Sequence, residues 1–180
     1  HTANIWHGCT KVNMGCDVCY AELCAKMYGN DIWGDDKPRK QIKSVWSALL
    51  QFQKEARAAG MMHRVFAGSM HDIFEKPMPL IDHKGNKLAH NTGELRQQLF
   101  DNISNGMYPN LMFLLLTKRP SNINKYIPAD WKEHPPVNVM FGTSPVNQAT
   151  AFNYCVNRPT SFVQTFTSSG TWVKPANITY

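Results

Sequence analysis

Three cysteines lie within eleven residues near the start of the chain, at Cys9, Cys16 and Cys19 in the run GCTKVNMGCDVCYAE. Thiolates this close in sequence can converge on one metal ion or one iron–sulfur cluster. The number three is informative, because a structural zinc site normally closes its tetrahedron with four protein ligands. A site with an open position instead binds and activates another molecule. The spacing therefore predicts a metal centre with one coordination position available.

The residues alone leave four identities open for this centre. The first, which we favour, is an iron–sulfur cluster with one open iron. The second is a closed zinc site with His7 or Cys24 as the fourth ligand. The others are a site on Cys16 and Cys19 alone, and a group of packed structural thiols. Cys24 follows Cys19 by five residues on an expected helix, so the two should point about 140° apart. We therefore expect Cys24 to be a buried helix cysteine.

The expected secondary structure explains how these residues are positioned. Apolar periodicity predicts strands over 4–7, 64–68, 111–117 and 137–142, and helices over 17–27, 44–60, 93–103, 121–126 and 146–156. Asp17 is the expected cap of the first helix, and 69–87 is expected to be a polar loop. The alternation predicts an α/β fold with parallel strands, a partial (β/α) barrel of about four βα units.

The chain divides into two parts by periodicity and composition. Residues 1–157 carry the alternating elements and form the predicted partial barrel. Residues 158–180 are rich in Ser, Thr and aromatics without helical periodicity, and they are expected to form an extended or irregular C-terminal appendage.

Polar residues follow each expected strand at the point where it ends. After the first strand come the three cysteines, followed along the chain by Ser69 to Asp72, Thr117 to Arg119, and Thr143 with Ser144. Parallel α/β sheets bind ligands at the carboxyl ends of their strands. The sequence therefore predicts one functional rim.

Two pairs of residues on this rim are candidates for chemistry. His71 and Asp72 could form a proton-transfer or substrate-binding pair; the alternative is a capping Asp beside a solvent-facing His. Lys118 and Arg119 follow a strand too apolar to be exposed, and they could hold a carboxylate or phosphate of a cofactor or substrate. The alternative is that Lys118 and Arg119 only form the polar start of the next loop and hold no ligand.

Two further residues follow the last expected strand. Ser144 and Asn147 could bind ribose hydroxyls, and capping of the following helix is the alternative.

Composition limits the partners and the compartment. The chain has 180 residues and a net charge of +6, which favours a polyanionic partner such as nucleic acid, although a solvated basic surface gives the same count. The longest basic cluster, 37–40, is expected in a loop. Five cysteines, three of them in one short stretch, indicate a reducing compartment, the cytoplasm of a bacterial host. No apolar run has the length of a membrane span, and no secretory leader is evident.

Five sequence blocks in order carry a family resemblance: WHGCTKV, GCDVCYAE, SMHDIF, LLLTKRP and GTSPVNQ. Over roughly 4–148 the chain resembles the phage-associated three-cysteine-motif family of largely unknown function, whose cysteine loop is similar to that of radical S-adenosylmethionine (SAM) enzymes. The resemblance implies a [4Fe–4S] cluster on Cys9, Cys16 and Cys19, with SAM chelating the fourth iron. It implies cleavage of SAM to a 5′-deoxyadenosyl radical that abstracts hydrogen from a substrate. It also implies that Ser69 contacts the methionine part of SAM and that Tyr20 covers the cluster or adenine.

We therefore expect a radical SAM enzyme acting on a nucleic acid or nucleotide, working with SAM and with a separately encoded partner protein. A zinc-stabilised nucleic-acid-binding module is the alternative. A third possibility is a phage virion component, because TFTSSGTWVKPANITY is similar to a segment of phage tail-fibre proteins.

Overall fold

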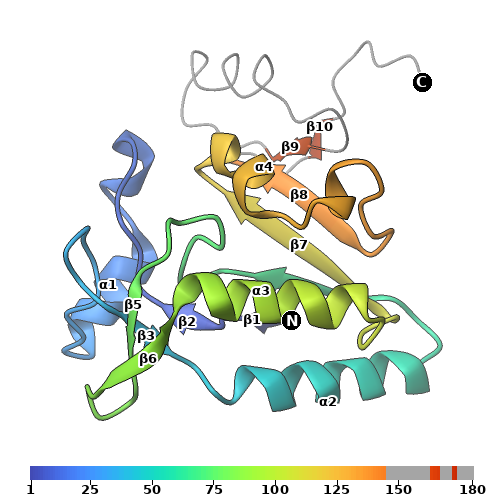
Figure 1. Ribbon diagram of the computed structural model, residues 1–180, viewed down its shortest axis with the longest axis horizontal. Coiled ribbons are helices and arrows are strands. Elements are labelled where there is room, and N and C mark those ends of the chain that lie inside the picture. The colour runs from blue at the N-terminus through green and yellow to red at the C-terminus, as the bar shows by residue number, and fades with distance from the viewer. Residues whose placement is uncertain (145–162, 167–171, 174–180) are drawn as a thin grey trace.

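The computed structural model describes residues 1–144, 163–166 and 172–173 of the chain. The larger of its two sheets has six strands in the order β1-β4-β7-β8-β9-β10 (Figure 1). They are β1 (Thr2–Ala3), β4 (His63–Ala67), β7 (Leu111–Thr117), β8 (Val139–Thr143), β9 (Val163–Phe166) and β10 (Trp172–Val173). Neighbours from β1 to β9 pair in parallel, and β10 pairs antiparallel with β9. The expected parallel α/β sheet is confirmed, and β9 and β10 are extended segments within the expected appendage.

A second, four-stranded sheet was not foreseen. Its strands are β2 (Trp6–His7), β3 (Arg39–Gln41), β5 (Pro79–Ile81) and β6 (Lys87–Asn91), in the order β2-β3-β5-β6. The prediction of a loop over 69–87 is therefore wrong, since this range holds β5 and the start of β6. Asp82 closes the turn between these strands by accepting hydrogen bonds from the backbone of Lys84 and Asn86. The strand expected over 4–7 is also only partly correct. β1 ends before this range and belongs to the larger sheet, whereas β2 lies within it and belongs to the second sheet.

The described helices largely follow the apolar periodicity. They are α1 (Tyr20–Met27), α2 (Val45–Ala58), α3 (Thr92–Ser104) and α4 (Ile123–Tyr126), with 3-10 turns η1 (Met14–Cys16), η2 (Pro120–Asn122) and η3 (Asp130–Lys132). Cys19 is the N-cap of α1, so the prediction that Asp17 caps this helix is wrong. The helix expected over 146–156 lies outside the described residues. None of the helices that the structure describes combines the length and the apolar character needed to cross a bilayer.

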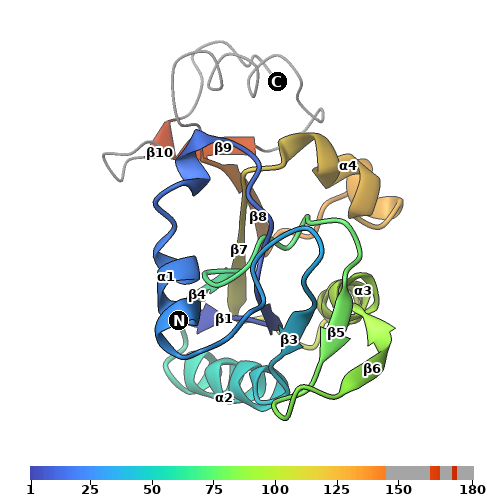
Figure 2. The ribbon, with the colours of Figure 1, turned by 90° about the vertical axis from the view of Figure 1, so that its left-hand side faces the viewer.

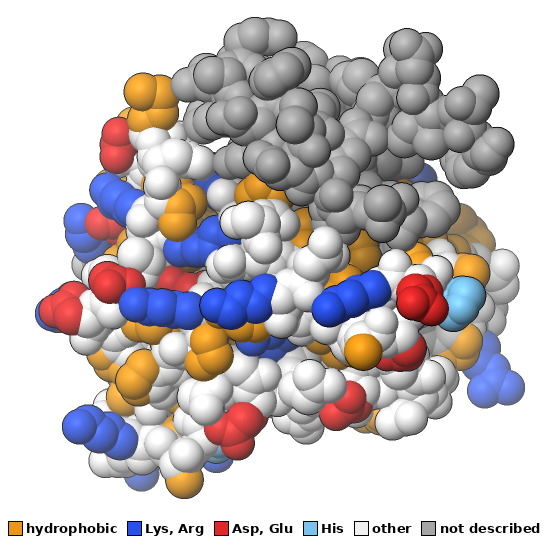
Figure 3. All heavy atoms as spheres, turned by 45° about the horizontal axis from the view of Figure 1, so that its top comes forward, with side chains coloured by type: hydrophobic (Ala, Val, Ile, Leu, Met, Phe, Trp, Pro, Cys, Tyr) orange, Lys and Arg blue, Asp and Glu red, His pale blue; other side chains and the backbone are white. Residues whose placement is uncertain are grey.

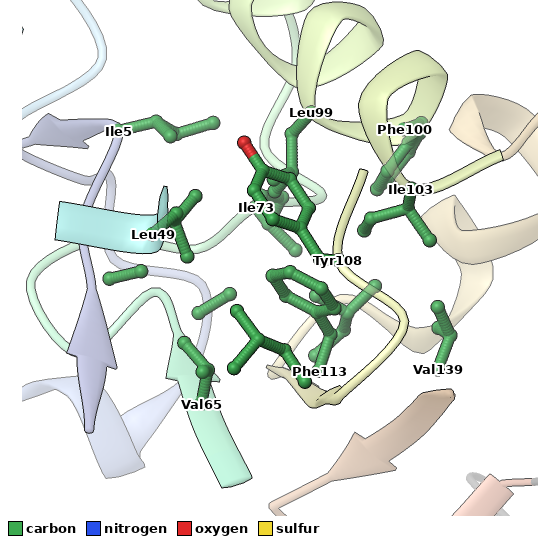
Figure 4. Packing of buried hydrophobic residues seen from close by; sticks show 14 of the residues in the cluster. Ile5, Leu49, Val65, Ile73, Leu99, Phe100, Ile103, Tyr108, Phe113 and Val139 are labelled. Carbon is green, nitrogen blue, oxygen red and sulfur yellow. The ribbon is translucent and has the colours of Figure 1, made fainter. Parts of the chain in front are cut away.

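The core lies between the larger sheet and helices α2 and α3, which are seen with the sheet from two directions in Figures 1 and 2. Figure 4 shows Leu49 of α2 and Leu99 of α3 among the side chains around Val65 and Phe113 of the sheet. Alternate residues of β7 are fully buried, from Leu111 through to its end. This packing fixes β4, β7 and β8 relative to one another, so their carboxyl ends form one rigid edge.

Candidate metal and cofactor site

A pocket of about 170 Å³ lies at the carboxyl ends of the parallel strands. Ten of the eleven expected site residues line it: Cys9, Cys16, Cys19, Tyr20, Ser69, His71, Asp72, Lys118, Arg119 and Ser144. The eleventh, Asn147, lies outside the described residues. The structure therefore brings residues from four separate parts of the sequence to one pocket, although the cysteine segment follows β2 of the second sheet and not a strand of the parallel sheet.

The cysteine loop runs from β2 to α1 and is tied to another part of the chain at its start. Gly8 adopts a φ of 109°, and a Cβ at this position would lie 2.4 Å from the carbonyl oxygen of Ile32, so only glycine fits. The Gly8 N–H donates to the Met70 carbonyl at 3.1 Å, which ties the loop to the segment after β4. Further along, Asn13 caps η1 by accepting from the Gly15 N–H at 3.0 Å. The loop that carries the three sulfurs is thus anchored to the sheet edge.

A buried ion pair lies directly beneath this loop. Arg39 of β3 and Glu75 form two hydrogen bonds, 2.9 Å from Nε to Oε2 and 2.7 Å from Nη2 to Oε1. Their side chains are 0% and 1% exposed. Both partners also hold Thr10, since Glu75 accepts from its N–H at 2.8 Å and Arg39 donates to its hydroxyl at 2.8 Å. The residue after Cys9 is therefore fixed by two buried charges.

Asp72 forms a second polar cluster on the opposite wall. Its carboxylate accepts from the Thr117 hydroxyl at 2.7 and 2.9 Å and from the N–H groups of Phe74 and Lys118 at 3.0 and 3.1 Å. Arg119 adds an ion pair through Nη1 at 3.1 Å. With its acceptor sites engaged, Asp72 is suited to positioning Arg119, and proton transfer by Asp72 stays a prediction.

Arg119 links this cluster to the cysteine loop. Its Nη1 lies 3.5 Å from Cys9 Sγ, its Nη2 donates to the Thr10 carbonyl, and Nη2 lies 3.6 Å from Glu75 Oε1. Burial lowers the pKa of the Arg119 guanidinium, but its acidic neighbours, Asp72 above all, raise it by more, so the side chain stays charged. The expected cation is therefore present in the pocket, held by two carboxylates and aimed at a sulfur.

The charge state of Cys9 follows from these neighbours. Burial and, less strongly, the charge of Glu75 raise the pKa of its thiol to about 12, against an opposing effect of Arg119. Without a bound cation this sulfur is a neutral thiol at neutral pH. A metal supplies the positive charge that makes a coordinating cysteine a thiolate.

His71 is buried beside the pocket without a partner for its ring. Neither Nδ1 nor Nε2 has a hydrogen-bond partner among the described residues, and the ring packs 4.2 Å from that of Trp6. Burial and, to a lesser degree, His7 lower its pKa to about 3, so the imidazole is neutral at physiological pH. A neutral imidazole offers one donor and one acceptor to a bound molecule.

Tyr20 and Ser69 meet at the mouth of the pocket. The Tyr20 hydroxyl donates to the Ser69 carbonyl, so α1 is joined to the segment after β4. Asn4 holds the same segment from below, by donating to the Ser69 hydroxyl at 2.9 Å and accepting from the Met70 N–H at 2.8 Å. Ser144 N–H bonds the Thr117 carbonyl at 3.3 Å, which joins the ends of β7 and β8.

The donor set distinguishes between kinds of metal centre. Two thiolates on one zinc ion lie about 3.8 Å apart, given Zn–S bonds of about 2.3 Å in a tetrahedron. In the part of the chain that the structure describes, the three pocket sulfurs do not all lie within 4.8 Å of one another. A [4Fe–4S] cluster places each thiolate on a separate iron and so requires wider spacing. Neither Cys24 nor His7, the two candidate fourth ligands, lines the pocket. Among the described residues, three thiols and no candidate fourth ligand therefore line the pocket.

Several residues that build the site were missed from the sequence. Arg39 lies in the basic run expected to be a loop; that prediction is wrong for its second half, because Arg39 begins β3 and is fully buried. Glu75 and Asn4 belong to no recognisable motif, and Thr10 stands out only as part of the cysteine run. The sequence offers one signal for the burial of Glu75. This residue directly follows the apolar residues Ile73 and Phe74, which indicates a buried carboxylate that needs a cation.

Comparison with known proteins gives one match. The model of a family described as "Protein of unknown function (DUF5131)" matches residues 1–158. No curated protein and no solved structure matches the chain. The description of this family names no activity, so a function can be proposed only from the site itself.

Proposed function

We propose that this chain, which belongs to the DUF5131 family of proteins of unknown function, is a radical SAM iron–sulfur enzyme. The proposed cluster is a [4Fe–4S] group on Cys9, Cys16 and Cys19, with SAM at the fourth iron. The observation that carries the proposal is that three cysteines, and neither candidate fourth ligand, line one pocket at the strand ends. When bound and reduced, such a cluster supplies the electron that cleaves SAM and starts hydrogen abstraction.

The fold supports this proposal at a coarser level. The parallel strands β1, β4, β7, β8 and β9 are neighbours in chain order, as successive strands of a βα barrel are. We infer that the larger sheet is a partial (β/α) barrel. Its carboxyl edge is then the face on which barrel enzymes carry their active sites.

The residues of the chain have distinct roles in this proposal. The pocket of about 170 Å³ is smaller than a typical ligand pocket of about 300–1,000 Å³. It therefore suits the inorganic group and the amino-acid end of SAM, with the rest of SAM along the open rim. Lys118 and Arg119 line the pocket and are proposed to hold the SAM carboxylate, with Ser69 and His71 as neutral hydrogen-bonding groups near it. Tyr20, 59% exposed at the mouth, is placed to cover the group from solvent.

The substrate class proposed is a nucleic acid or nucleotide. The support is the net charge of +6 and the spread of Lys and Arg side chains, with acidic residues among them, over the face shown in Figure 3. Binding through phosphates predicts an affinity that falls steeply with salt, with a log–log slope near the number of neutralised phosphates.

The test of the proposed cofactors is electron paramagnetic resonance of the anaerobically reconstituted, dithionite-reduced chain. SAM should change the spectrum of the cluster if it coordinates the open iron. Cys24→Ser is the matched control, because this cysteine does not line the pocket and should leave the spectrum unchanged. A spectrum indifferent to SAM would remove the radical SAM proposal while leaving the cluster.

A further inference from the structure

A second group of metal-ligating side chains lies at the opposite end of the sheet from the cysteine pocket. His1, Glu55 and His63 each offer one ligand atom, and these atoms all lie within 4.8 Å of one another. His1 immediately precedes β1 and His63 is the first residue of β4, so both lie at the amino ends of parallel strands. β4 runs from His63 to Ala67, about 13 Å at about 3.3 Å per residue, and Ser69 of the pocket follows its far end. The group is distinct from the cysteine pocket.

The two imidazoles already face each other. His1 Nε2 lies 3.0 Å from His63 Nδ1, so the pair shares one proton between two ring nitrogens. Two nitrogen ligands on a tetrahedral zinc ion, with Zn–N bonds of about 2.0–2.1 Å, lie about 3.4 Å apart. Replacing the shared proton with a metal ion therefore requires the nitrogens to separate by only a few tenths of an ångström.

The backbone and one aromatic ring hold the histidines in place. The His1 carbonyl accepts from the Phe66 N–H at 3.0 Å, and the His1 nitrogen donates to the Arg64 carbonyl at 3.2 Å. The His63 N–H donates to the Asn110 carbonyl at 2.9 Å. The His1 ring also stacks on Phe52 of α2, with centroids 4.0 Å apart and planes 20° from parallel. The site is thus organised by the sheet rather than by chance contact of flexible chains.

Glu55 supplies the third ligand from the same helix. It lies three residues after Phe52, so both side chains project from one side of α2. Figures 1 and 2 show α2 passing close to the N-terminus. Its carboxylate is exposed and bonds only the Gln51 amide, at 2.9 Å, among the contacts described. An exposed Glu side chain has the freedom to close on a metal ion at low cost.

We propose that His1, Glu55 and His63 form a binding site for a divalent first-row transition metal ion, zinc above all. Two imidazoles and one carboxylate are ligands that Zn²⁺ accepts in three-ligand sites, and water completes the coordination. The ion bridges β1, β4 and α2. It therefore clamps His1 and β1 to β4 and α2, independently of whatever the cysteine pocket holds.

The test is titration of the full chain with Co²⁺ under anaerobic conditions, followed by absorption spectroscopy. Cobalt bound by thiolates produces an intense sulfur-to-metal charge-transfer band, and cobalt bound by nitrogen and oxygen does not. The wild type should bind one equivalent that does not contribute to that band, besides any cobalt held by the three pocket cysteines. Glu55→Gln and His63→Ala should weaken this binding at least tenfold. His83→Ala, at an exposed position in the β5–β6 turn, is the matched control and should bind as the wild type does.

Two results would overturn the proposal. One is binding by Glu55→Gln and His63→Ala that equals the wild type. The other is a wild-type spectrum that reports thiolate ligation alone. If His63→Ala does not fold by circular dichroism, Glu55→Gln decides the matter, because its exposed side chain has no part in the core.

Discussion

The Arg39–Glu75 pair offers the sharpest test of how the cysteine loop is supported. In an Arg39→Met variant, Glu75 loses the two hydrogen bonds that Arg39 donates to it. It keeps the hydrogen bond from the Thr10 N–H at 2.8 Å and the contact with Arg119 at 3.6 Å. Because both side chains are at most 1% exposed, the remaining charge cannot be rescued by water. Removing one partner of a buried pair costs about 3–5 kcal/mol.

This loss should be plain in thermal unfolding followed by circular dichroism. For a chain of this size, each kcal/mol shifts the melting temperature by about 2–4 °C, so we expect a decrease of about 6–20 °C. Lys76→Met is the matched control. It removes a cation from an ion pair with Asp35 whose side chains are 54% and 69% exposed, and it should melt at the wild-type temperature.

A double variant separates loss of charge balance from loss of packing. Arg39→Met combined with Glu75→Gln leaves no unpaired carboxylate, and the glutamine oxygen can still accept from Thr10. It should be more stable than Arg39→Met alone. An Arg39→Met protein with the melting temperature of the wild type would refute the reasoning. A double variant that is less stable than Arg39→Met would do so as well.

Three further predictions follow from the site. Burial holds the pKa of His71 at about 3, whereas it is 6.5 in the unfolded chain, so between these values the unfolded state binds the extra proton and stability falls as pH falls. From pH 8 to pH 5 the free energy of unfolding, measured by urea titration, should fall by about 2 kcal/mol in the wild type and in His83→Phe, but not in His71→Phe. Equal pH slopes in all three proteins would contradict this. Thr117→Val removes a hydroxyl bonded to both oxygens of Asp72 and should lower the free energy of unfolding by about 1.5–3 kcal/mol, a loss that urea titration would detect or exclude. With a pKa of about 12, Cys9 in the metal-free folded chain at pH 9 should react with iodoacetamide roughly 500-fold more slowly than in the urea-unfolded chain, and similar rates by peptide mass spectrometry would count against the assignment.

The elements defined by local periodicity were predictable from the sequence. The helices expected over 44–60 and 93–103 are present as α2 and α3, and the strand expected over 111–117 is β7 with the same bounds. Their apolar repeats are long enough to determine type and approximate ends. The pocket was predictable for a related reason. Once the strands are parallel, their carboxyl ends meet, so the residues after β4, β7 and β8 must share one edge. The cysteine segment follows β2 of the second sheet and is joined to this edge by the Gly8–Met70 hydrogen bond.

The second sheet and the buried polar clusters were not predictable in this way. Strands β3 and β5 have three residues each, too few for an alternating pattern, and they pair across 39 to 81 in the chain. Arg39 resembles a surface residue in the basic run around it, and only its tertiary contact with Glu75 reverses that expectation. Local sequence does not report a partner 36 residues away.

The most direct test of the central claim is the metal content of the full chain after anaerobic reconstitution with ferrous iron and sulfide. We predict about four irons and about four sulfides per chain, the composition of a [4Fe–4S] cluster. Cys9→Ser, Cys16→Ser and Cys19→Ser should each lose the cluster, and Cys24→Ser should keep it. A colourless protein that retains one zinc ion on these cysteines and takes up no iron would contradict the account.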